Sequence, residues 1–360
     1  RFVYIVHNKP AFSIEEGSYI GTQNVTLTNL PANLATTTTS YPQVWYYLGE
    51  NKTDSVQYTS AEQTIAVSES TKVCVYIIDE DSGKVVKSKA VEAEYTILKS
   101  LGLRFYTSEN SYMQTGSSQG TIEYGSEYTA PTLKGDTGDG YTADLSGFNI
   151  TYSSSDPTTA TIDETGKITI VGGGFTTIKA ESEATETFAA DATWYVLKVR
   201  PADPDVSISE GAYFTGQKLT LTRVGQNGSM YYSYGSKEAS ERTAYTGEIT
   251  LPAGVYDFYP YTRCGTDEQN IWSYGNAHRM LYVYDQPTIS KDAGEYVGDI
   301  EVEITDRPEG GTYSAKSYYY FNDDVENAKA YTAGDKIVVN ESKTLKVYIE
   351  VLGDSSKKHR

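Results

Sequence analysis

One spacing of residues occurs three times in this chain and constrains its fold more than any other feature. A proline is followed seven positions later by a glycine, and two positions after that by a tyrosine. Eight residues after the glycine comes a short segment with apolar residues at every second position. The copies are Pro10/Gly17/Tyr19 with Val25/Leu27, Pro204/Gly211/Tyr213 with Leu219/Leu221, and Pro287/Gly294/Tyr296 with Val302/Ile304. Repetition at this spacing predicts three copies of one structural unit.

Alternation of apolar and polar residues predicts that the unit is made of strands. Runs such as Lys72–Ile77 and Thr344–Ile349 alternate with a period of two, and no stretch shows a sustained helical period. Proline marks the entry to an edge strand, and glycine permits a turn with positive φ. About seven short strands in roughly 85 residues are typical of an immunoglobulin-like sandwich. The predicted fold class is therefore all-β, with a string of immunoglobulin-like β-sandwich domains.

Each copy continues with an aromatic strand and then a single tyrosine. The aromatic strands are Trp45-Tyr46-Tyr47, Tyr232-Ser233-Tyr234 and Tyr318-Tyr319-Tyr320, and the single tyrosines are Tyr58, Tyr245 and Tyr331. This pattern resembles the repeat named for the C-terminal domain of chitobiase and β-hexosaminidase. The resemblance covers roughly 9–97, 202–285 and 286–360, but the usual Asp-Gly-Ser-x-Pro turn after the aromatic strand is absent.

The segment between the first two copies is different. It contains Tyr152-Ser-Ser-Ser-Asp-Pro157, Gly166-Lys-Ile-Thr and Gly172-Gly-Gly-Phe-Thr-Thr-Ile-Lys-Ala180. This run resembles the group 2 bacterial immunoglobulin-like domain. From the residues alone, Thr165-Gly166 predicts a tight hairpin, and Lys134–Gly140 is expected to form a long exposed loop.

These patterns predict four modules and the end of another. We expect residues 1–8 to be the last strand of a preceding repeat, because Phe2-Val-Tyr-Ile-Val6 is similar to Tyr282-Val-Tyr284. The first module is expected at 9–97, the second (group 2-like) at 98–201, the third at 202–285, and the fourth, truncated, at 286–360. Short proline-containing linkers such as 200–204 predict an elongated, semi-rigid array, monomeric within a longer chain.

Charge and cysteine content exclude several classes of partner. The chain has 30 basic and 48 acidic residues, a net charge of −18, which repels nucleic acids and anionic lipids. No apolar run approaches the roughly 20 residues of a membrane span. Cys74 and Cys264 are expected to be free, buried thiols, because they lie in separate predicted domains.

No set of residues predicts catalysis, so the chain is not expected to be an enzyme. His7, His278 and His359 lie near module edges and the chain end, which does not favour a metal site or a catalytic triad. No cofactor is expected. Calcium is the alternative left open, at Asp136, Asp139 and Asp144 or at Asp79-Glu-Asp81, although neither group has the spacing of a known calcium loop.

The aromatic residues are the candidate binding groups, because sugar rings stack on exposed tryptophan and tyrosine. The residues predicted as carbohydrate-contacting are Trp45, Tyr47, Tyr232, Tyr234, Trp272, Tyr318 and Tyr320. The competing interpretation is structural, since half of each strand must face the core.

The sequence predicts a non-catalytic spacer segment of a secreted or cell-surface bacterial protein. Two alternatives remain: an array of carbohydrate-binding or adhesin modules, with glycans or a host or cell-surface protein as partner, and accessory domains of a glycoside hydrolase whose catalytic domain lies outside this chain. The family name favours the last only by association.

Overall fold

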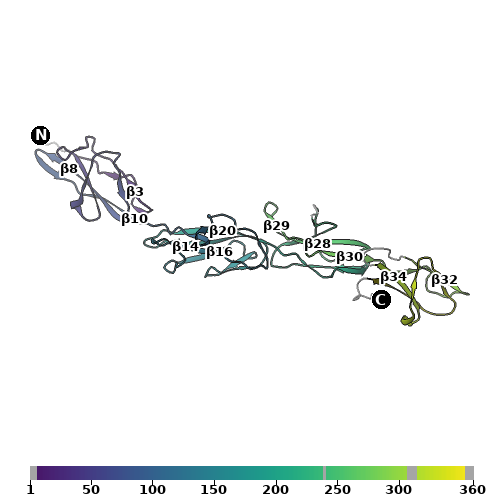
Figure 1. Cartoon of the computed structure of the whole chain (residues 1–360). Coiled ribbons are helices and arrows are strands. Elements are labelled where there is room, and N and C mark those ends of the chain that lie inside the picture. Colours follow the sequence, from purple (N-terminus) through teal and green to yellow (C-terminus); the bar gives the residue numbers. More distant parts are fainter. Residues whose placement is uncertain (1–5, 238–240, 306–313, 353–360) are drawn as a thin grey trace. The chain divides into compact units, whose positions relative to one another are not determined.

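The protein is all-β, as predicted. The computed structural model describes residues 6–237, 241–305 and 314–352, and in these ranges the regular elements are strands apart from two short 3-10 turns (Figure 1). No helix in the described ranges is long and apolar enough to cross a membrane. The predicted strand at residues 1–8 falls largely, and His359 entirely, outside the described residues.

The first module contains ten strands and one 3-10 turn. A mixed sheet in the order β2-β10-β8-β5-β6, with β9 paired to β8, is accompanied by the two-stranded sheets β1-β4 and β3-β7. The elements are β1 Ala11–Phe12, β2 Gly17–Ile20, β3 Gln23–Val25, β4 Leu27–Thr28, β5 Gln43–Leu48, η1 Lys52–Asp54, β6 Val56–Tyr58, β7 Ile65–Val67, β8 Thr71–Asp81, β9 Lys84–Lys87 and β10 Val91–Leu98.

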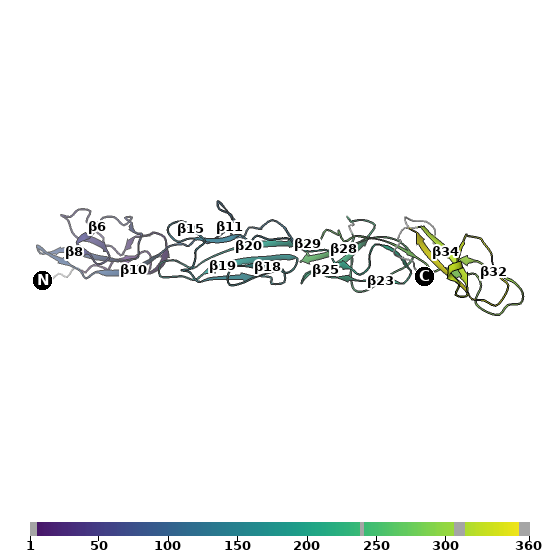
Figure 2. The ribbon, with the colours of Figure 1, turned by 60° about the horizontal axis from the view of Figure 1, so that its bottom comes forward.

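The second module forms its own sheets, β12-β11-β14-β15, β13-β20-β19-β16 and the hairpin β17-β18. Figure 2 shows β19 beside β20. The predicted hairpin at Thr165-Gly166 is confirmed: Gly166 has φ +82° and joins β17 to β18. The strands are β11 Arg104–Ser108, β12 Ser111–Tyr112, β13 Ile122–Glu123, β14 Thr132–Asp136, β15 Tyr141–Thr142, β16 Ile150–Ser154, β17 Ala160–Ile162, β18 Ile168–Ile170, β19 Gly174–Ser182 and β20 Asp191–Arg200.

The third module repeats the pairing of the first. Its sheet runs β22-β30-β28-β25-β26, with β29 paired to β28, and the two-stranded sheets are β21-β24 and β23-β27. Figure 1 shows β28 and β30 lying side by side. The strands are β21 Asp205–Val206, β22 Gly211–Phe214, β23 Gln217–Leu219, β24 Leu221–Thr222, β25 Ser229–Tyr234, β26 Thr243–Ala244, β27 Ile249–Leu251, β28 Gly254–Gly265, β29 Asn270–Trp272 and β30 Arg279–Tyr284.

The fourth module has the corresponding sheets β31-β33, β32-β36 and β35-β34-β37. Its elements are β31 Thr288–Ile289, β32 Ile300–Val302, β33 Ile304–Thr305, β34 Ser314–Phe321, η2 Val325–Asn327, β35 Lys329–Tyr331, β36 Ile337–Val339 and β37 Leu345–Leu352.

The repeated tyrosine after the glycine makes the same hydrogen bond in every copy. The hydroxyls of Tyr19, Tyr213 and Tyr296 donate to the backbone carbonyl four residues earlier, at 2.7, 2.7 and 2.8 Å. Gly17 and Gly211 have φ of +155° and +146°, a region that favours glycine. The repeated motif therefore closes the loop that precedes the second strand of each sandwich.

By contacts, the chain divides into two compact units. One contains residues 1–117, 130–153 and 178–195, and the other contains 118–129, 154–177 and 196–360. The division therefore passes through the second module, whereas every sheet consists of strands from one predicted module. Separate buried clusters form the cores of the first, third and fourth modules.

Both cysteines are free and buried, as predicted. Cys74 lies in β8 and Cys264 in β28. Burial raises the pKa of the Cys264 thiol to about 11.

Candidate functional site

An aromatic cross-strand pair occupies the same register on the outer face of three sheets. Trp45 of β5 lies opposite Tyr76 of β8, Tyr231 of β25 opposite Tyr261 of β28, and Tyr318 of β34 opposite Tyr348 of β37. The residues next to them, Tyr46, Tyr232 and Tyr319, pack against the cores. Because successive side chains of a strand point to opposite faces, these pairs point away from the core. We call them the outer-face aromatic pairs.

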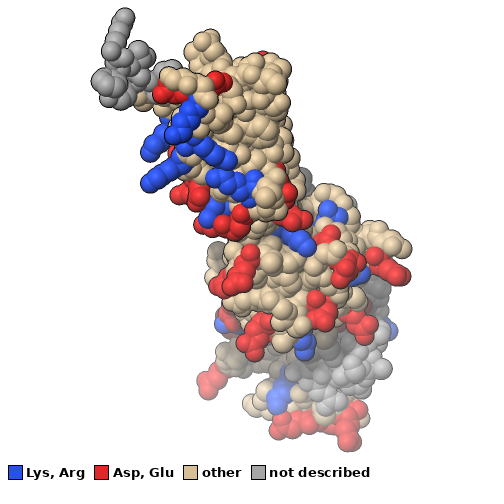
Figure 3. All heavy atoms as spheres, turned by 90° about the vertical axis from the view of Figure 1, so that its left-hand side faces the viewer, with Lys and Arg blue, Asp and Glu red and all other residues tan. Residues whose placement is uncertain are grey.

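In the first module, two lysines lie over the outer-face aromatic pair. The ammonium groups of Lys52 and Lys87 are 5.1 and 3.5 Å from the centroid of the Tyr76 ring, and Tyr76 is only 4% exposed. Lys and Arg side chains also gather on one face of this module (Figure 3). Trp45 is partly buried, and its indole Nε1 donates to Oε1 of Gln43 at 2.9 Å. Because the lysines cover Tyr76, the exposed part of the Trp45 ring is the aromatic surface of this pair that solvent can reach.

Tyr47 lies beside this pair, 6.3 Å from the Tyr76 ring centroid. A hydrogen bond with the Cys74 thiol, together with burial, raises the pKa of Tyr47 to about 12. Burial likewise raises the pKa of Cys74. Both groups are therefore neutral at physiological pH.

In the third module, Trp272 of β29 extends the outer-face pair into a cluster of three rings. Its centroid is 4.9 Å from that of Tyr231 and 6.4 Å from that of Tyr261. The guanidinium of Arg242 lies 4.5 Å from the Tyr261 ring and 4.6 Å from the Trp272 ring, and Nε of Arg242 is buried without a hydrogen-bond partner. Arg242 therefore covers the Tyr261 ring and part of the Trp272 ring. Tyr231 and Trp272 remain partly exposed.

In the fourth module, the pair is a parallel stack. The rings of Tyr318 and Tyr348 are 5.2 Å apart and inclined by 10°, and Tyr320 contacts Tyr348 edge-on at 6.1 Å. Burial raises the pKa of Tyr318. All three side chains are partly buried, so the stack combines packing with some accessible ring surface.

The structure therefore groups Trp45 with Tyr47, and Tyr318 with Tyr320, and it places Trp272 in a third cluster. Tyr232 lies on the opposite face of β25, where its ring stacks on Phe258 at 5.6 Å. Tyr234 shares that face at the strand end and is 43% exposed. Five further residues of these clusters were not predicted from the sequence: Tyr76, Tyr231, Arg242, Tyr261 and Tyr348. Alternation along β8, β28 and β37 could have identified Tyr76, Tyr261 and Tyr348, whereas no sequence signal marked Arg242.

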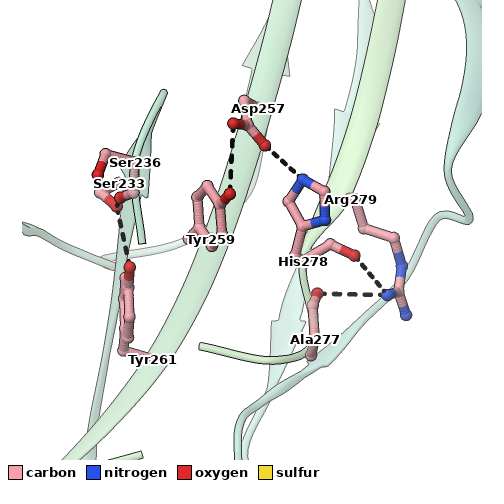
Figure 4. A network of polar contacts seen from close by, with 8 residues as sticks. All are labelled: Ser233, Ser236, Asp257, Tyr259, Tyr261, Ala277, His278 and Arg279. Carbon is pink, nitrogen blue, oxygen red and sulfur yellow. Dashed lines mark hydrogen bonds and ion pairs between the residues drawn. The ribbon is translucent and has the colours of Figure 1, made fainter. Parts of the chain in front are cut away.

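Figure 4 shows a polar network on the outer face of the third module, in which Tyr259 lies between Tyr261 and His278. Nε2 of His278 contacts Oδ1 of Asp257, and the Tyr259 hydroxyl donates to the other oxygen of this carboxylate at 3.3 Å. Ser233 is hydrogen-bonded to Tyr261, at 3.3 Å, and to the backbone of Ser236. The serine and the histidine are thus engaged with different partners, and the network has no paired nucleophile and base.

Three of the acidic residues considered for calcium, Asp136, Asp144 and Asp79, make hydrogen bonds within the protein. Oδ1 of Asp136 accepts from the backbone amides of Gly138 and Gly140 at 3.0 and 3.2 Å, and Oδ1 of Asp144 accepts from Ser146 at 3.2 Å. Asp79 accepts from His7, with 2.7 Å between the polar atoms. Across the described ranges, no three His, Cys, Asp or Glu side chains are grouped to hold a metal ion. The prediction of a long exposed loop at 134–140 was wrong in part, because residues 134–136 belong to β14, which pairs with β15.

A second polar site joins the end of the second module to the third. Nη1 of Arg200 donates to the carbonyl of Trp272 at 2.8 Å, Nε of Arg200 is 3.3 Å from Oε1 of Glu123, and the guanidinium lies 4.3 Å from the Tyr274 ring. The Tyr274 hydroxyl donates to the same Glu123 oxygen at 3.1 Å. One arginine thus contacts groups from β13, β29 and the loop that follows β29.

The linker residue Asp203 completes this joint. Its carboxylate accepts hydrogen bonds from the backbone amides of Gly275 and Ala277 at 2.7 and 2.9 Å, and also from Asn276. On the other side, Nδ2 of Asn227 donates to Thr159 at 3.1 Å, and a Cβ at Gly172 would lie 2.5 Å from Oδ1 of Asn227. Gly172 therefore has to lack a Cβ because Asn227 of the third module and the carbonyl of Thr158 both approach it closely.

Comparisons with known proteins were made for both sequence and structure. The family model of the intimin immunoglobulin-like domain matches residues 146–185. A search of curated protein sequences found no match. The S-layer protein rSbsC(31-844) is 14% identical, with 95% of this chain and 50% of that chain covered and a TM-score of 0.25, so this chain spans about half of its length. Sidekick-1 immunoglobulin domains 1–5 are 9% identical, with 93% and 78% coverage and a TM-score of 0.19. The human desmocollin-1 ectodomain is 9% identical, with 95% and 78% coverage and a TM-score of 0.20.

The intimin-type match falls within the segment that resembles a group 2 bacterial immunoglobulin-like domain, and it supports the coarser assignment, immunoglobulin-like. These comparisons do not confirm the chitobiase-like repeats. The family model and the fold together show a tandem array of immunoglobulin-like β-sandwich modules.

Proposed function

We propose that this chain is a non-catalytic spacer segment of an exported bacterial surface protein, in which the second and third modules are held together as a stiff joint. The observation that carries the proposal is the joint around Arg200 and Asp203. An ionised carboxylate that accepts three backbone amides forms strong, directional hydrogen bonds. A flexible linker would leave these groups in water.

Packing between the third and fourth modules supports the same function. Ala315 of β34 packs against the buried cluster of Ala212, Tyr282 and Tyr284 in the third module. Burial raises the pKa of Tyr284. Apolar contacts of this kind resist bending between neighbouring modules. We also propose that the modules are of the chitobiase-like and group 2 types, which are common in exported bacterial proteins.

The test measures the distance distribution between two spin labels on the full chain, one on the exposed residue Thr161 of β17 and one on the exposed residue Thr250 of β27. We expect a narrow distribution in the native chain and a clearly broader one after Asp203→Ala. Asp205→Ala is the matched control, because Asp205 is an exposed carboxylate two residues away, and it should leave the width unchanged. A native distribution as broad as that of Asp203→Ala would contradict the stiff joint.

A second candidate function is glycan binding by the outer-face aromatic pairs, supported by their recurrence at one register in three modules. Partly exposed Trp45, Tyr231, Trp272 and Tyr318 would supply the stacking surface, with Tyr47 and Tyr320 beside it. A glycan array probed with the full chain tests this function. We expect binding that falls at least ten-fold after Trp45→Ala but not after Tyr112→Ala, an exposed aromatic residue outside the pairs. An absence of binding to any glycan would overturn it.

A further inference from the structure

The first module carries two lysines whose charges are not neutralised by a carboxylate. Lys52 of η1 and Lys87 of β9 are exposed, and their ammonium groups lie 5.1 and 3.5 Å from the centroid of the Tyr76 ring. The ion pairs that this module forms among the described residues involve other cations, Lys72 and His7. Both ammonium groups are therefore available to an anionic ligand.

Carboxylates near these lysines are hydrogen-bonded to other groups. Asp54, two residues after Lys52, accepts from Nδ2 of Asn51 at 2.7 Å. Asp79 of β8, the strand that pairs with β9, lies 2.7 Å from Nε2 of His7. The whole chain has a net charge of −18, yet Lys and Arg side chains gather on one face of this module (Figure 3). Charge complementarity therefore favours an anionic ligand at this place.

Trp45 supplies a flat surface next to these charges. It lies directly opposite Tyr76 across β5 and β8, so the two side chains are neighbours on one face of the sheet. Nε1 of the indole donates to Oε1 of the buried residue Gln43 at 2.9 Å, which holds the ring in one orientation. The ring is partly exposed, and because it is already held in place, it loses little freedom when a sugar ring stacks on it.

We propose that Trp45, Lys52 and Lys87 form a binding surface for an oligosaccharide of uronic acids, and we call it the Trp45–lysine surface. The proposal rests on the glycan-binding candidate function and adds the class of sugar. A pyranose ring stacks on the indole, and its carboxylate forms a charge-assisted hydrogen bond with an ammonium group. A uronic acid carries one charge per ring, whereas the net charge of −18 repels densely charged polyanions such as nucleic acids.

The outer-face aromatic pairs of the third and fourth modules lack this combination. In the third, the guanidinium of Arg242 lies 4.6 Å from the Trp272 ring, on part of the surface that a sugar would contact. In the fourth, burial and the nearby carboxylate of Glu350 raise the pKa of Tyr318, so the charged neighbour of that pair is negative. We therefore assign the acidic ligand to the first module.

The first test compares acidic sugars with uncharged sugars of the same shape. Fluorescent oligomers of galacturonate, glucuronate and mannuronate are titrated with the full chain, each beside its methyl ester. We expect at least one acid to bind more tightly than its ester by roughly ten-fold or more, with an advantage that falls as salt is added.

Equal binding of acids and esters would overturn the acidic ligand and leave glycan binding intact. Absence of binding to both would also overturn the proposal, and the glycan array would then decide separately whether the chain binds any sugar. An oligoglutamate peptide is included, and tighter binding of this peptide than of every acidic sugar would assign the surface to acidic proteins instead.

The second test locates the ligand on the module. Lys87→Gln should weaken binding of the best acid by roughly ten-fold or more and leave binding of its ester unchanged, whereas Trp45→Ala should weaken both. Lys84→Gln is the matched control, because Lys84 is an exposed lysine of the same strand that lies opposite Asp81. Hydrogen exchange of β8 checks that each variant is folded. Equal losses in Lys84→Gln and Lys87→Gln would indicate general charge attraction and overturn the site.

Discussion

The first and fourth modules are built on the same repeat, yet their cores are unequal. Among the described residues, eleven form the buried cluster of the first module, from Val25 to Tyr95, whereas four form that of the fourth: Val302, Ile304, Tyr331 and Ile337. The strand pairings β3-β7 and β32-β36 correspond, as do β5-β8 and β34-β37. The difference is the closing strand, β10, which has no counterpart in the described part of the fourth module. In the first module, β10 contributes directly to this burial, because its residues Ala93 and Tyr95 belong to the cluster.

Removing the side chain at the centre of the closing strand should have the largest effect. Tyr95→Ala deletes a ring that is 1% exposed and packs against Phe12 and Tyr19, and it should destabilise the first module by about 3–5 kcal/mol. Hydrogen exchange of β8 measures the loss, with β28 of the third module as the internal control. Unchanged protection of β8 would show that β10 does not hold this core together.

A matched pair of substitutions measures the difference between the two modules directly. Val75→Ala removes two methyl groups from a site that is 0% exposed and should cost about 2 kcal/mol. Val347→Ala makes the same change at the corresponding, partly exposed position and should cost about 1 kcal/mol. Local stability from hydrogen exchange gives both values. Equal costs would mean that the fourth core is as well buried as the first.

The repeated tyrosine hydrogen bond should contribute equally in each module. Tyr19→Phe, Tyr213→Phe and Tyr296→Phe each remove one hydroxyl that donates to a carbonyl four residues earlier. Each should lower the stability of its own module by about 0.5–1.5 kcal/mol. Tyr112→Phe, at an exposed tyrosine outside the motif, serves as the control. A cost confined to one module would show that the motif has no common structural role.

The stability of the first module should also depend on pH in the alkaline range. Burial raises the pKa of Tyr95 from 10.0 to about 12, so the folded module keeps this proton between these values while the unfolded chain loses it. The stabilisation is complete below pH 10 and is lost as the pH rises through about 12. Denaturation of the native chain and of Tyr95→Phe between pH 9 and 12 measures it. The same alkaline slope in both proteins would assign the pH dependence to other groups.

The sequence predicted the fold class and the repeat because both depend on local spacing. Alternation of apolar residues specifies strands, and the glycine and tyrosine of the repeat specify a closed loop, as Gly17 and Tyr19 show. Alternation does not specify which of two aromatic neighbours faces the core, however. Tyr232 was therefore selected as a candidate where Tyr231 is the outward residue.

The remaining features depend on contacts between residues far apart in the sequence. Arg242 covers Trp272 because β25, β28 and β29 pair in one sheet, and Asp203 contacts residues 275–277 because the linker folds back onto the third module. Neither contact has a signature in residue spacing. The cavity of about 780 Å³ in the fourth module has no such signature either, because residues as far apart as Ile289 and Leu345 line it.

The most direct test of this account is hydrogen exchange of the full chain at a concentration where it is monomeric, comparing β8, β28 and β37. These three strands occupy the same position in three copies of one sandwich. We predict slow exchange along β8 and β28, which have partners on both sides, and faster exchange along β37, which in the described ranges pairs only with β34. Equally slow exchange in all three strands would contradict it.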